Sequence, residues 1–464
     1  MNILFALLSG LLLFITFPPF NLFFIAWFAL IPLLIAVKRA KTAKEAFLGG
    51  FLCGLVFFGG MLFWVNALMQ WAGAWAVIGF AVLVILQALF IGAFSFVAFH
   101  IIHHKFKSEI VVLALFWAVV EWLRSIGPFG VTGGDLAYSQ IGFLAAAQIA
   151  RIFGVFGVSF LIMVVNSLLF QLFVEEGKWL DRIKAKKVEI SAVLLVFLAV
   201  IIYGGVRMNR DFKFPNKVKV AVIQAAIPQD IKLDFGQVWA IVDLHKILSL
   251  KIVSEKPDII IWPETAVTTY LNLAPNVQRE IEQLVQDSKA SYLIGTSHTT
   301  GGKNYNSVVA FYPDGKMAGR YNKQRPVPFG EYLPLRFILY PILKGINLLA
   351  EDYHSDPSGN IIDLGNVKVG VVICFESTFP HLVRNKVKKG ADVIVVVTND
   401  AWFGGSAALA QHLQSSRMRA IENGVYVVQA ANTGISAIID PAGRVIERTG
   451  VDEEVIMLQD VYFQ

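Results

Sequence analysis

Seven long apolar runs occupy the first 206 residues, and they constrain the fold of this chain more than any other feature. They lie at about 3–17, 22–37, 46–68, 75–102, 110–126, 143–174 and 188–206. Because a helix needs roughly 17–25 apolar residues to cross a bilayer, we expect a bundle of about seven membrane-spanning helices. Pro18 and Pro19 separate the first two runs, and since proline interrupts a helix we expect a tight helical hairpin there.

A cleavable signal peptide is the alternative explanation for the first run. No basic segment precedes that run, and further apolar runs follow at once. A signal peptide normally begins with positive charge and is followed by a processing site. We therefore interpret the first run as a membrane helix.

The remainder of the chain has the mixture of charged residues, turn residues and short strands that is typical of a globular domain. Over the whole chain, 56% of residues are hydrophobic and only 16% are charged, whereas soluble domains carry about 25% charge. The contrast between the two halves predicts a transmembrane helix bundle over 1–206 and a globular domain over 217–464. The boundary should lie between Arg207 and Lys217.

Basic residues are distributed unequally over the loops between the apolar runs. With a cytoplasmic N-terminus, the outer loops hold only Arg124, and the cytoplasmic loops hold eleven basic residues: Lys38, Arg39, Lys41, Lys44, Lys105, Lys107, Lys178, Arg182, Lys184, Lys186 and Lys187. Cytoplasmic loops are enriched in Lys and Arg, so seven spans would place the globular domain on the extracytoplasmic side. These loops account for the net charge of +6, and we expect no nucleic-acid partner.

Several polar residues interrupt the apolar runs. Glu121 and Arg124 lie near the end of the fifth run, and Gln148, Arg151 and Asn166 lie in the sixth. A charge within a bilayer is costly and marks a functional site by default. We favour the structural alternative, in which Glu121 and Arg124 pair on one helix face or extend to the interface.

Short β-branched runs alternate with helical patterns in the globular domain. The helical patterns cover 235–254, 277–289 and 411–423, and the strand-like runs are Val218–Gln224, Asp258–Trp262, Ser291–Gly295, Ser307–Tyr312, Val367–Ile373, Asp392–Thr398, Val425–Ala430 and Ser436–Asp440. This alternation predicts an α/β domain whose helices cover the faces of its sheets.

Two segments of this domain carry charged side chains where strands are expected to end. Glu264 follows an apolar strand, and Pro263 should stop the pairing of that strand, so Glu264 should lie where the chain leaves the sheet. Lys323 and Glu331 lie on a proline-rich loop. Taken singly, a Glu or a Lys is more often a solvated surface charge than a catalytic group.

Cys374 ends an apolar strand, and Ser377 is placed to cap the helix that should follow. The other cysteine, Cys53, lies within a membrane span. Exported domains usually pair their cysteines or lack them, so a solitary thiol at a strand end is a candidate nucleophile. His412 lies in an expected helix, and the remaining histidines nearby lie in loops. A carboxylate base is therefore favoured over a papain-like histidine.

The motifs around these residues resemble those of known enzymes. Trp262–Glu264, Tyr321–Lys323 and Ile373–Glu376 resemble the Glu, Lys and Cys motifs of the nitrilase superfamily. Glu121–Arg124, Gly330–Pro334 and Asn399–Gly404 are similar to motifs of the bacterial apolipoprotein N-acyltransferases, as are Gln411–His412 and Arg417–Glu422. The resemblance covers nearly the whole chain.

The resemblance implies an αββα nitrilase-like catalytic domain on the periplasmic side of the bacterial inner membrane. The implied reaction moves an acyl chain from a phospholipid, with phosphatidylethanolamine the expected donor, to the N-terminal amine of an apolipoprotein diacylglyceryl-cysteine. A ping-pong mechanism would use Glu264 as base, Lys323 as oxyanion stabiliser and Cys374 as nucleophile. Positions that would bind substrate or support the triad are Glu331, Phe375, Glu376 and Trp402. No cofactor is implied, and the His and Cys residues show no metal-ligand spacing.

The chain departs from the family pattern at three places. Leu233 stands where the family commonly has Trp, and Phe375 stands where Tyr is frequent. The family's usual last membrane span, after the nitrilase-like domain, has no counterpart before Gln464. The first two departures should affect acyl-chain or phospholipid preference and leave the triad intact.

Two other functions remain compatible with parts of the sequence. A membrane-tethered amidase or nitrilase would use the same triad with water as the acceptor, although seven spans exceed what an anchor needs. A transporter or sensor with an α/β ligand-binding domain would leave Glu264, Lys323 and Cys374 unexplained. Free fatty acid, N-acylated peptide and a thioester on Cys374 distinguish these alternatives.

The segment from Leu333 to Ala350 is apolar apart from Arg336 and Lys344. It is too short to span a bilayer, and its prolines favour a loop over packed regular structure. An apolar stretch of this kind is either buried in the core or in contact with another apolar phase. We predict a mobile arm at the mouth of the active site that rests on the outer leaflet.

Overall fold

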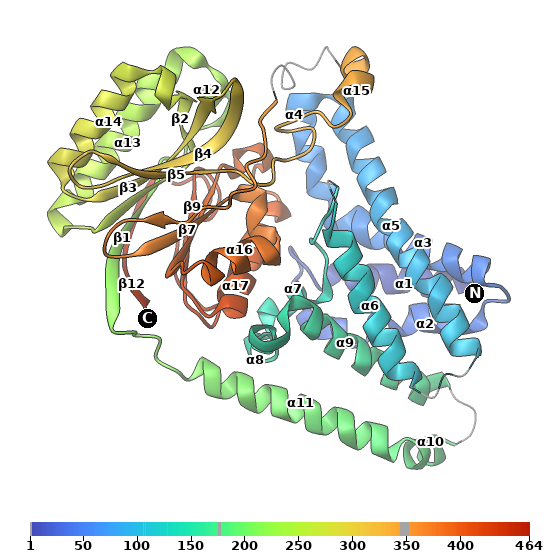
Figure 1. Ribbon diagram of the computed structural model, residues 1–464. Helices are drawn as coiled ribbons and strands as arrows, with labels where there is room; N and C mark the ends of the chain where they lie inside the picture. The colour runs from blue at the N-terminus through green and yellow to red at the C-terminus, as the bar shows by residue number, and fades with distance from the viewer. Residues whose placement is uncertain (1, 105, 107, 128, 175–177, 344–351) are drawn as a thin grey trace. The chain divides into compact units, whose positions relative to one another are not determined.

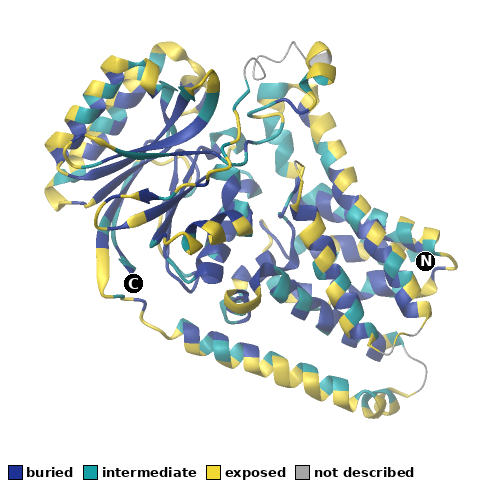
Figure 2. Cartoon of the chain, viewed as in Figure 1, coloured by how far each residue is buried: buried dark blue, intermediate teal, exposed yellow. Residues whose placement is uncertain are grey.

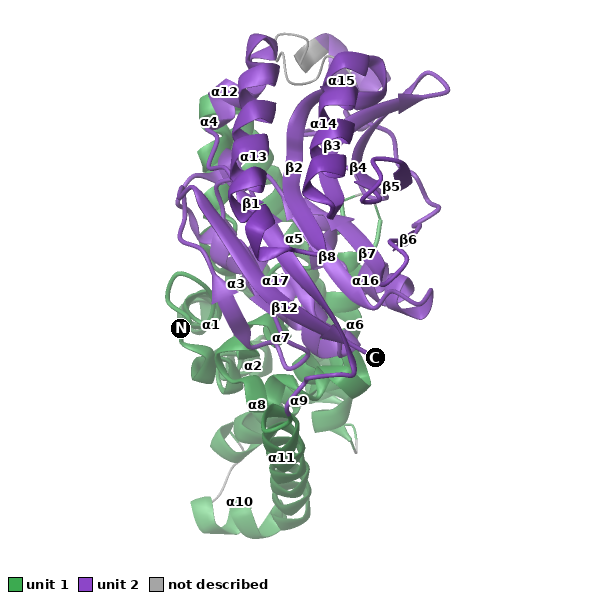
Figure 3. Ribbon diagram, turned by 90° about the vertical axis from the view of Figure 1, so that its left-hand side faces the viewer, with its two compact units in different colours: residues 1–210 green, residues 211–464 purple. Residues whose placement is uncertain are grey.

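The computed structural model describes residues 2–104, 106, 108–127, 129–174, 178–343 and 352–464. The chain divides into two compact units, residues 1–210 and residues 211–464, which Figure 3 shows in separate colours. The first unit is helical, and the second combines strands with helices.

The first unit contains eleven α-helices among its described residues, labelled in Figure 1, and short 3-10 turns lie in three of the connections between them. They are α1 (Asn2–Ile15), α2 (Ile31–Arg39), α3 (Ala43–Met61), α4 (Met69–Ala72), α5 (Ala74–His103), α6 (Glu109–Ser125), α7 (Leu136–Ser139), α8 (Leu144–Ala147), α9 (Ala150–Val174), α10 (Trp179–Ala185) and α11 (Lys187–Met208). The 3-10 turns are η1 (Phe23–Trp27), η2 (Phe63–Leu68) and η3 (Gln140–Gly142).

Four helices among the described residues are long and apolar enough to cross a membrane: α3, α5, α9 and α11. The other three predicted spans coincide with shorter helices, of which α2 has nine residues, α1 fourteen and α6 seventeen. At 1.5 Å per residue, α2 alone is too short to span a bilayer. The number of seven spans, and the orientation that depends on it, therefore stays a prediction.

The surface of α11 indicates what surrounds this unit. Many residues of α11 are coloured as exposed in Figure 2. The apolar side chains of Leu195 and Val188 are each 69% exposed in the chain itself. Exposed apolar surface on this scale requires an apolar environment. Contact with lipid accounts for the exposed apolar surface of α11.

The polar residues of the first unit are mostly buried and hydrogen-bonded. Arg124 forms an ion pair with Asp135 at 3.2 Å, so the expectation that it pairs with Glu121 or extends to the interface is wrong. Glu121 instead accepts hydrogen bonds from the Trp117 indole and from the main-chain N–H of Leu136. Both charged side chains hold the segment after α6 against the helices, which supports a structural role.

The second unit contains twelve strands and six α-helices among its described residues (Figure 1). The strands are β1 (Asn216–Gln224), β2 (Ile259–Tyr270), β3 (Ser291–Thr300), β4 (Lys303–Phe311), β5 (Met317–Asn322), β6 (Ile362–Asp363), β7 (Lys368–Ile373), β8 (Val393–Thr398), β9 (Val427–Ala431), β10 (Ala437–Ile439), β11 (Val445–Arg448) and β12 (Val455–Phe463). The helices are α12 (Gln229–Leu233), α13 (Val238–Ile252), α14 (Pro275–Ser288), α15 (Arg336–Leu343), α16 (Pro380–Lys388) and α17 (Ala407–Asn423). Short 3-10 turns include η4 (Phe235–Gln237), η8 (Cys374–Thr378) and η9 (Asp400–Phe403).

The strands form two six-stranded sheets, in the orders β12-β1-β2-β3-β4-β5 and β11-β10-β9-β8-β7-β6. In each sheet three neighbouring strands run parallel, β1-β2-β3 in one and β7-β8-β9 in the other. One hydrophobic core contains residues of both sheets, which therefore pack face to face. Helices α13 and α14 cover the outer face of the first sheet, and residues of α16 and α17 share a core with the second. The predicted αββα fold is confirmed.

Alternation of side chains along the strands explains the layers. Successive side chains of a strand point to opposite faces. In β1, Val220 and Val222 enter the core between the sheets, and Ala221 and Ile223 pack beneath the helices. All eight predicted strands are present, and β5, β6, β11 and β12 are additional.

Candidate active site

Glu264 occupies a break in β2. Pairing between β2 and β3 is interrupted between Trp262 and Val267, and Thr265 has a φ of +51°. The prediction that Pro263 ends the strand is wrong, because β2 resumes and continues to Tyr270. The break is nevertheless what matters, since it turns the Glu264 side chain out of the regular ladder.

Two uncharged donors, besides the Lys323 ammonium, hold the buried Glu264 carboxylate. Its Oε2 accepts a hydrogen bond from the main-chain N–H of Asn399 at 2.9 Å, and its Oε1 accepts one from the Asn306 amide at 2.7 Å. Asn399 follows β8, and Asn306 lies on β4. The carboxylate is thus held between the two sheets.

Lys323 follows β5 directly and is 1% exposed. Its Nζ lies 2.9 Å from Glu331 Oε2 and 3.4 Å from Glu264 Oε1. Burial alone would lower the pKa of Lys323, but the charges of Glu331 and Glu264 overcome that effect and raise the pKa. Lys323 is therefore a buried ammonium between two carboxylates.

Glu331 is tied into the same cluster. One of its oxygens accepts a hydrogen bond from the main-chain N–H of Val327 at 2.7 Å, which closes the loop that follows Lys323. The Asn306 amide also donates to Glu331, at 2.6 Å, so one amide group bridges both carboxylates. The position of Glu331 suits the predicted role of orienting Lys323.

Cys374 is the first residue of η8, immediately after β7. Its φ is +52°, a left-handed conformation that costs a non-glycine residue roughly 1–2 kcal/mol. Burial and then the charge of Glu264 raise the pKa of the thiol well above its usual range, and Lys323 opposes this rise. Cys374 is consequently a thiol at rest and needs a base to become a nucleophile.

Glu376 is fully buried and connects the cysteine turn to the lysine loop. Its carboxylate accepts hydrogen bonds from the Tyr321 hydroxyl and from the main-chain N–H groups of Gln324, Arg325 and Ile373. Gln324 and Arg325 follow Lys323, and Ile373 precedes Cys374. The predicted supporting role fits this geometry, because Glu376 fixes the distance between nucleophile and cation.

The other predicted positions lie around this cluster. Phe375 packs its ring edge-on against Phe379, with the ring centroids 4.8 Å apart. Trp402 lies on η9 and is half-buried, and the side chain of Leu233 at the end of α12 is exposed. Ser377 hydrogen-bonds His412 and does not cap the following helix, so that expectation is wrong.

Three residues of the cluster were assigned no role from the sequence. Asn306 bridges the carboxylates, and Asn399 holds Glu264. Lys232 on α12 is buried and donates to the main-chain oxygen of Glu264 at 3.0 Å and to the Asn399 amide oxygen at 3.2 Å. Burial lowers the pKa of Lys232 to about 7. Asn399 could have been found by the argument applied to Glu264 and Cys374, since it follows an apolar strand of the same sheet as Cys374.

The structure therefore brings a thiol, a buried carboxylate and a fixed cation together in one cluster. They suit attack on a carbonyl carbon, because Lys323 offers positive charge where an oxyanion would develop. Among the residues that the structure describes, no group of three or more His, Cys, Asp or Glu side chains could hold a metal ion.

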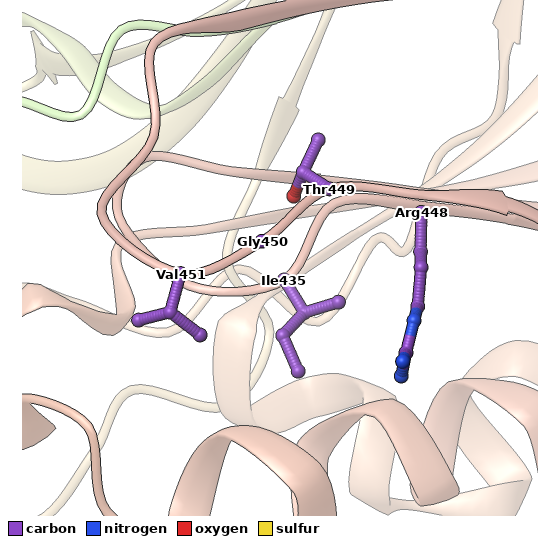
Figure 4. Close-up of a pocket in the computed structure, with 5 residues that line it drawn as sticks. All are labelled: Ile435, Arg448, Thr449, Gly450 and Val451. Carbon is purple, nitrogen blue, oxygen red and sulfur yellow. The ribbon is translucent and has the colours of Figure 1, made fainter.

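A pocket of about 320 Å³ lies elsewhere in the second unit. Figure 4 shows its lining residues, Ile435, Arg448, Thr449, Gly450 and Val451. None of them takes part in the hydrogen bonds and ion pairs that hold Glu264, Lys323 and Cys374. The geometry of the reactive side chains, and not this pocket, identifies the candidate active site.

Comparisons with known proteins match both units. Residues 9–168 match the apolipoprotein N-acyltransferase N-terminal domain, and residues 219–463 match the carbon–nitrogen hydrolase family. Proteins named apolipoprotein N-acyltransferase from Geobacter metallireducens and Rickettsia prowazekii are 33% and 31% identical, over 99% and 96% of this chain and 89% of each relative. The nitrilase-superfamily protein Nit3 of Saccharomyces cerevisiae is 18% identical, with a TM-score of 0.42 over 55% of this chain and 92% of Nit3.

Identity above 30% over nearly the full length, together with two matching domain families in the same order, leaves one assignment. The helical unit and the nitrilase-like unit are the two halves of one membrane enzyme, an acyltransferase. The chain belongs to the apolipoprotein N-acyltransferase family of the nitrilase superfamily.

Proposed function

We propose that this enzyme transfers an acyl chain from a phospholipid, phosphatidylethanolamine foremost, to the N-terminal amine of the diacylglyceryl-cysteine of apolipoproteins. The observation that carries the proposal is the cluster of Cys374, Glu264 and the buried Lys323 in a chain that also has four membrane-length helices. The relatives' names supply the class of acceptor. The donor follows from the need for an acyl ester that is available within a membrane.

The first half-reaction forms a thioester. Glu264 takes the proton of the Cys374 thiol, and the sulfur attacks the ester carbonyl carbon of the phospholipid. Lys323 stabilises the tetrahedral oxyanion. The intermediate collapses by breaking the bond to the glycerol oxygen, which leaves as a lysophospholipid alcohol after receiving the proton from Glu264.

The second half-reaction uses the same groups in the reverse sense. Glu264 takes a proton from the incoming α-amine, whose nitrogen attacks the thioester carbon. The carbon–sulfur bond breaks, an amide forms, and Cys374 regains its proton. Glu331 keeps Lys323 oriented in both steps, which its 2.9 Å ion pair supports.

The arm that includes α15 provides the route for lipid in this proposal. Phe337 is 81% exposed and Leu335 60%, and a soluble surface rarely presents such side chains together. The arm is helical over Arg336–Leu343, so the expectation of an irregular loop is wrong there, and residues 344–350 of the predicted segment lie outside the described residues. Leu333 is buried and anchors the start of the arm.

We further propose that the N-terminus is cytoplasmic and that the catalytic unit is periplasmic at the bacterial inner membrane. The unequal distribution of basic residues over the loops supports this orientation. Phe235 is 83% exposed, so Phe235→Cys provides a site for a membrane-impermeant maleimide. Labelling of cells with a permeabilised outer membrane and an intact inner membrane supports the orientation, and labelling only after the inner membrane is lysed contradicts it.

The reaction itself is tested with purified enzyme, phosphatidylethanolamine and a diacylglyceryl-cysteine peptide. We expect N-acylated peptide and lysophospholipid in equal amounts. Release of free fatty acid at the same rate with and without peptide would instead identify a hydrolase. A Cys374→Ser variant should give neither product above background.

A further inference from the structure

His412, on α17, is not used in the mechanism above, although its ring lies behind the nucleophile. Its Nε2 is 3.1 Å from the main-chain oxygen of Cys374 and 2.8 Å from Ser377 Oγ, and its Nδ1 is 3.1 Å from Asp400 Oδ1. It does not bond the thiol, so it is not the base. It contacts the backbone of the residue that carries the thiol.

The partners of the two ring nitrogens determine the charge of the ring. The carboxylate of Asp400 and the carbonyl of Cys374 can only accept hydrogen bonds. A neutral imidazole has one N–H and one lone pair. With its N–H on Nδ1, toward Asp400, it could accept a hydrogen bond from the Ser377 hydroxyl through Nε2, but its lone pair would then also face the Cys374 oxygen at 3.1 Å. Only an imidazolium donates to both Asp400 and the Cys374 oxygen, with Nε2–H shared between that oxygen and Ser377 Oγ.

Thr398 completes a closed path around the nucleophile. Its hydroxyl donates to Asp400 Oδ1 at 2.7 Å, and its side chain also contacts the Cys374 thiol. The path therefore runs from the Cys374 sulfur through Thr398, Asp400 and His412 back to the Cys374 carbonyl. The path therefore holds both the sulfur and the carbonyl oxygen of Cys374, whose backbone is in a left-handed conformation.

The charges around His412 are consistent with a cation. Asp400 on η9 and Glu264 on β2 are the negative charges that act on it. On α17 itself, Arg419 is paired with Glu422 at 3.0 Å, and on α16 Lys386 lies over the Tyr321 ring. Burial alone would lower the pKa of His412, but Asp400 and the hydrogen bonds overcome it and raise the pKa.

We propose that His412 is a positioning residue that acts as an imidazolium: it fixes the strained Cys374 turn through the Cys374 carbonyl and supplies a second positive charge, beside Lys323, that favours the thiolate. This inference rests on the proposed role of Cys374 as nucleophile. It explains why a thiol flanked by Glu264 and Asp400 can still be deprotonated. It makes reactivity depend on a group that loses its charge as pH rises.

Alkylation of Cys374 tests the proposal without acyl transfer. The full-length protein in detergent is treated with iodoacetamide from pH 5.5 to 9, and the rate at Cys374 is measured by peptide mass spectrometry. His412→Gln keeps a hydrogen-bond donor without the charge, and we expect about tenfold slower alkylation at pH 7, because a neighbouring cation shifts a thiol pKa by about one unit or more. His412→Lys restores a cation and should recover most of the rate, and His381→Gln, at the exposed start of α16, should change nothing.

An unchanged rate profile in folded His412→Gln would overturn the proposal, as would equal losses in the Gln and Lys variants. A second measurement needs no variant. In wild-type protein labelled with ¹⁵N-histidine, one of the eight histidines should keep both ring nitrogens protonated at pH 7.5, and eight neutral rings would contradict the proposal. If alkylation shifts as expected but no acyl transfer occurs, the proposed function fails and the role of His412 stands.

Discussion

Replacing Glu376 by alanine should destabilise the catalytic unit strongly, although Glu376 contacts none of the reacting atoms. The change leaves four donors without their acceptor, namely the Tyr321 hydroxyl and the N–H groups of Gln324, Arg325 and Ile373. A buried donor left unsatisfied costs about 1–3 kcal/mol. Gln324 and Arg325 are half-buried, whereas Tyr321 and Ile373 are fully buried. With the lower value taken for all four donors, the sum is at least about 4 kcal/mol.

In a unit of this size, about 1 kcal/mol corresponds to roughly 2–4 °C in the unfolding midpoint, so we expect a decrease of about 10 °C. The midpoint is measured by thermal unfolding in detergent, and acyl-enzyme formation is followed in parallel below the new midpoint. Thioester should form slowly because Lys323 is no longer held at the cysteine turn. Glu255→Ala removes an exposed glutamate and serves as the control. A Glu376→Ala protein with a normal midpoint and normal acylation would refute this reasoning.

Three further outcomes follow from the site and the arm. Glu264→Gln should block thioester formation because no base remains, and Lys323→Met should slow it by about 10²–10³-fold through loss of oxyanion stabilisation; normal accumulation of thioester in either variant would contradict the assigned role. Three side chains of the arm are exposed, those of Leu335, Phe337 and Ile338. Replacing all three with serine should slow turnover with phospholipid more than it lowers the unfolding midpoint. Unfolding of the protein would instead identify these positions as core. The pKa of Lys232 is about 7 in the folded chain and near 10.4 in the unfolded chain. Between these pH values the unfolded chain binds more protons, so the stability of the folded chain rises with pH. Lys232→Met should flatten that rise in the unfolding midpoint, and an unchanged slope would contradict this role of Lys232.

The α/β architecture could be predicted because its signals are local. Short apolar runs with β-branched residues indicate strands, and the helical patterns between them indicate helices. Both are recognised from the local sequence, without information on distant contacts. β12 was missed because its pattern carries Gln459 and Asp460, and it is stabilised by pairing with β1, far away in sequence. The resumption of β2 after Pro263 was missed for the same reason, since β3 provides its partner.

The reactive residues could be predicted from strand ends, whereas their supports could not. Lys323 and Cys374 each follow a strand, and Glu264 lies at the break in β2 that comes directly after Pro263. Asn306 lies within β4, and only the approach of Glu264 and Glu331 from other segments gives it a role. The partner of Arg124 was predicted wrongly because Asp135 lies beyond a loop and outside the helix.

The acyl chain proposed on Cys374 can be detected in the intact mass of protein purified from membranes. We expect an added mass equal to one fatty acyl group, lost on treatment with hydroxylamine and absent from Cys374→Ser. Addition of diacylglyceryl-cysteine peptide should return the protein to its unmodified mass as N-acyl peptide appears. Turnover near the wild-type rate in Cys374→Ser, or an acyl group mapped to another residue, would contradict the account.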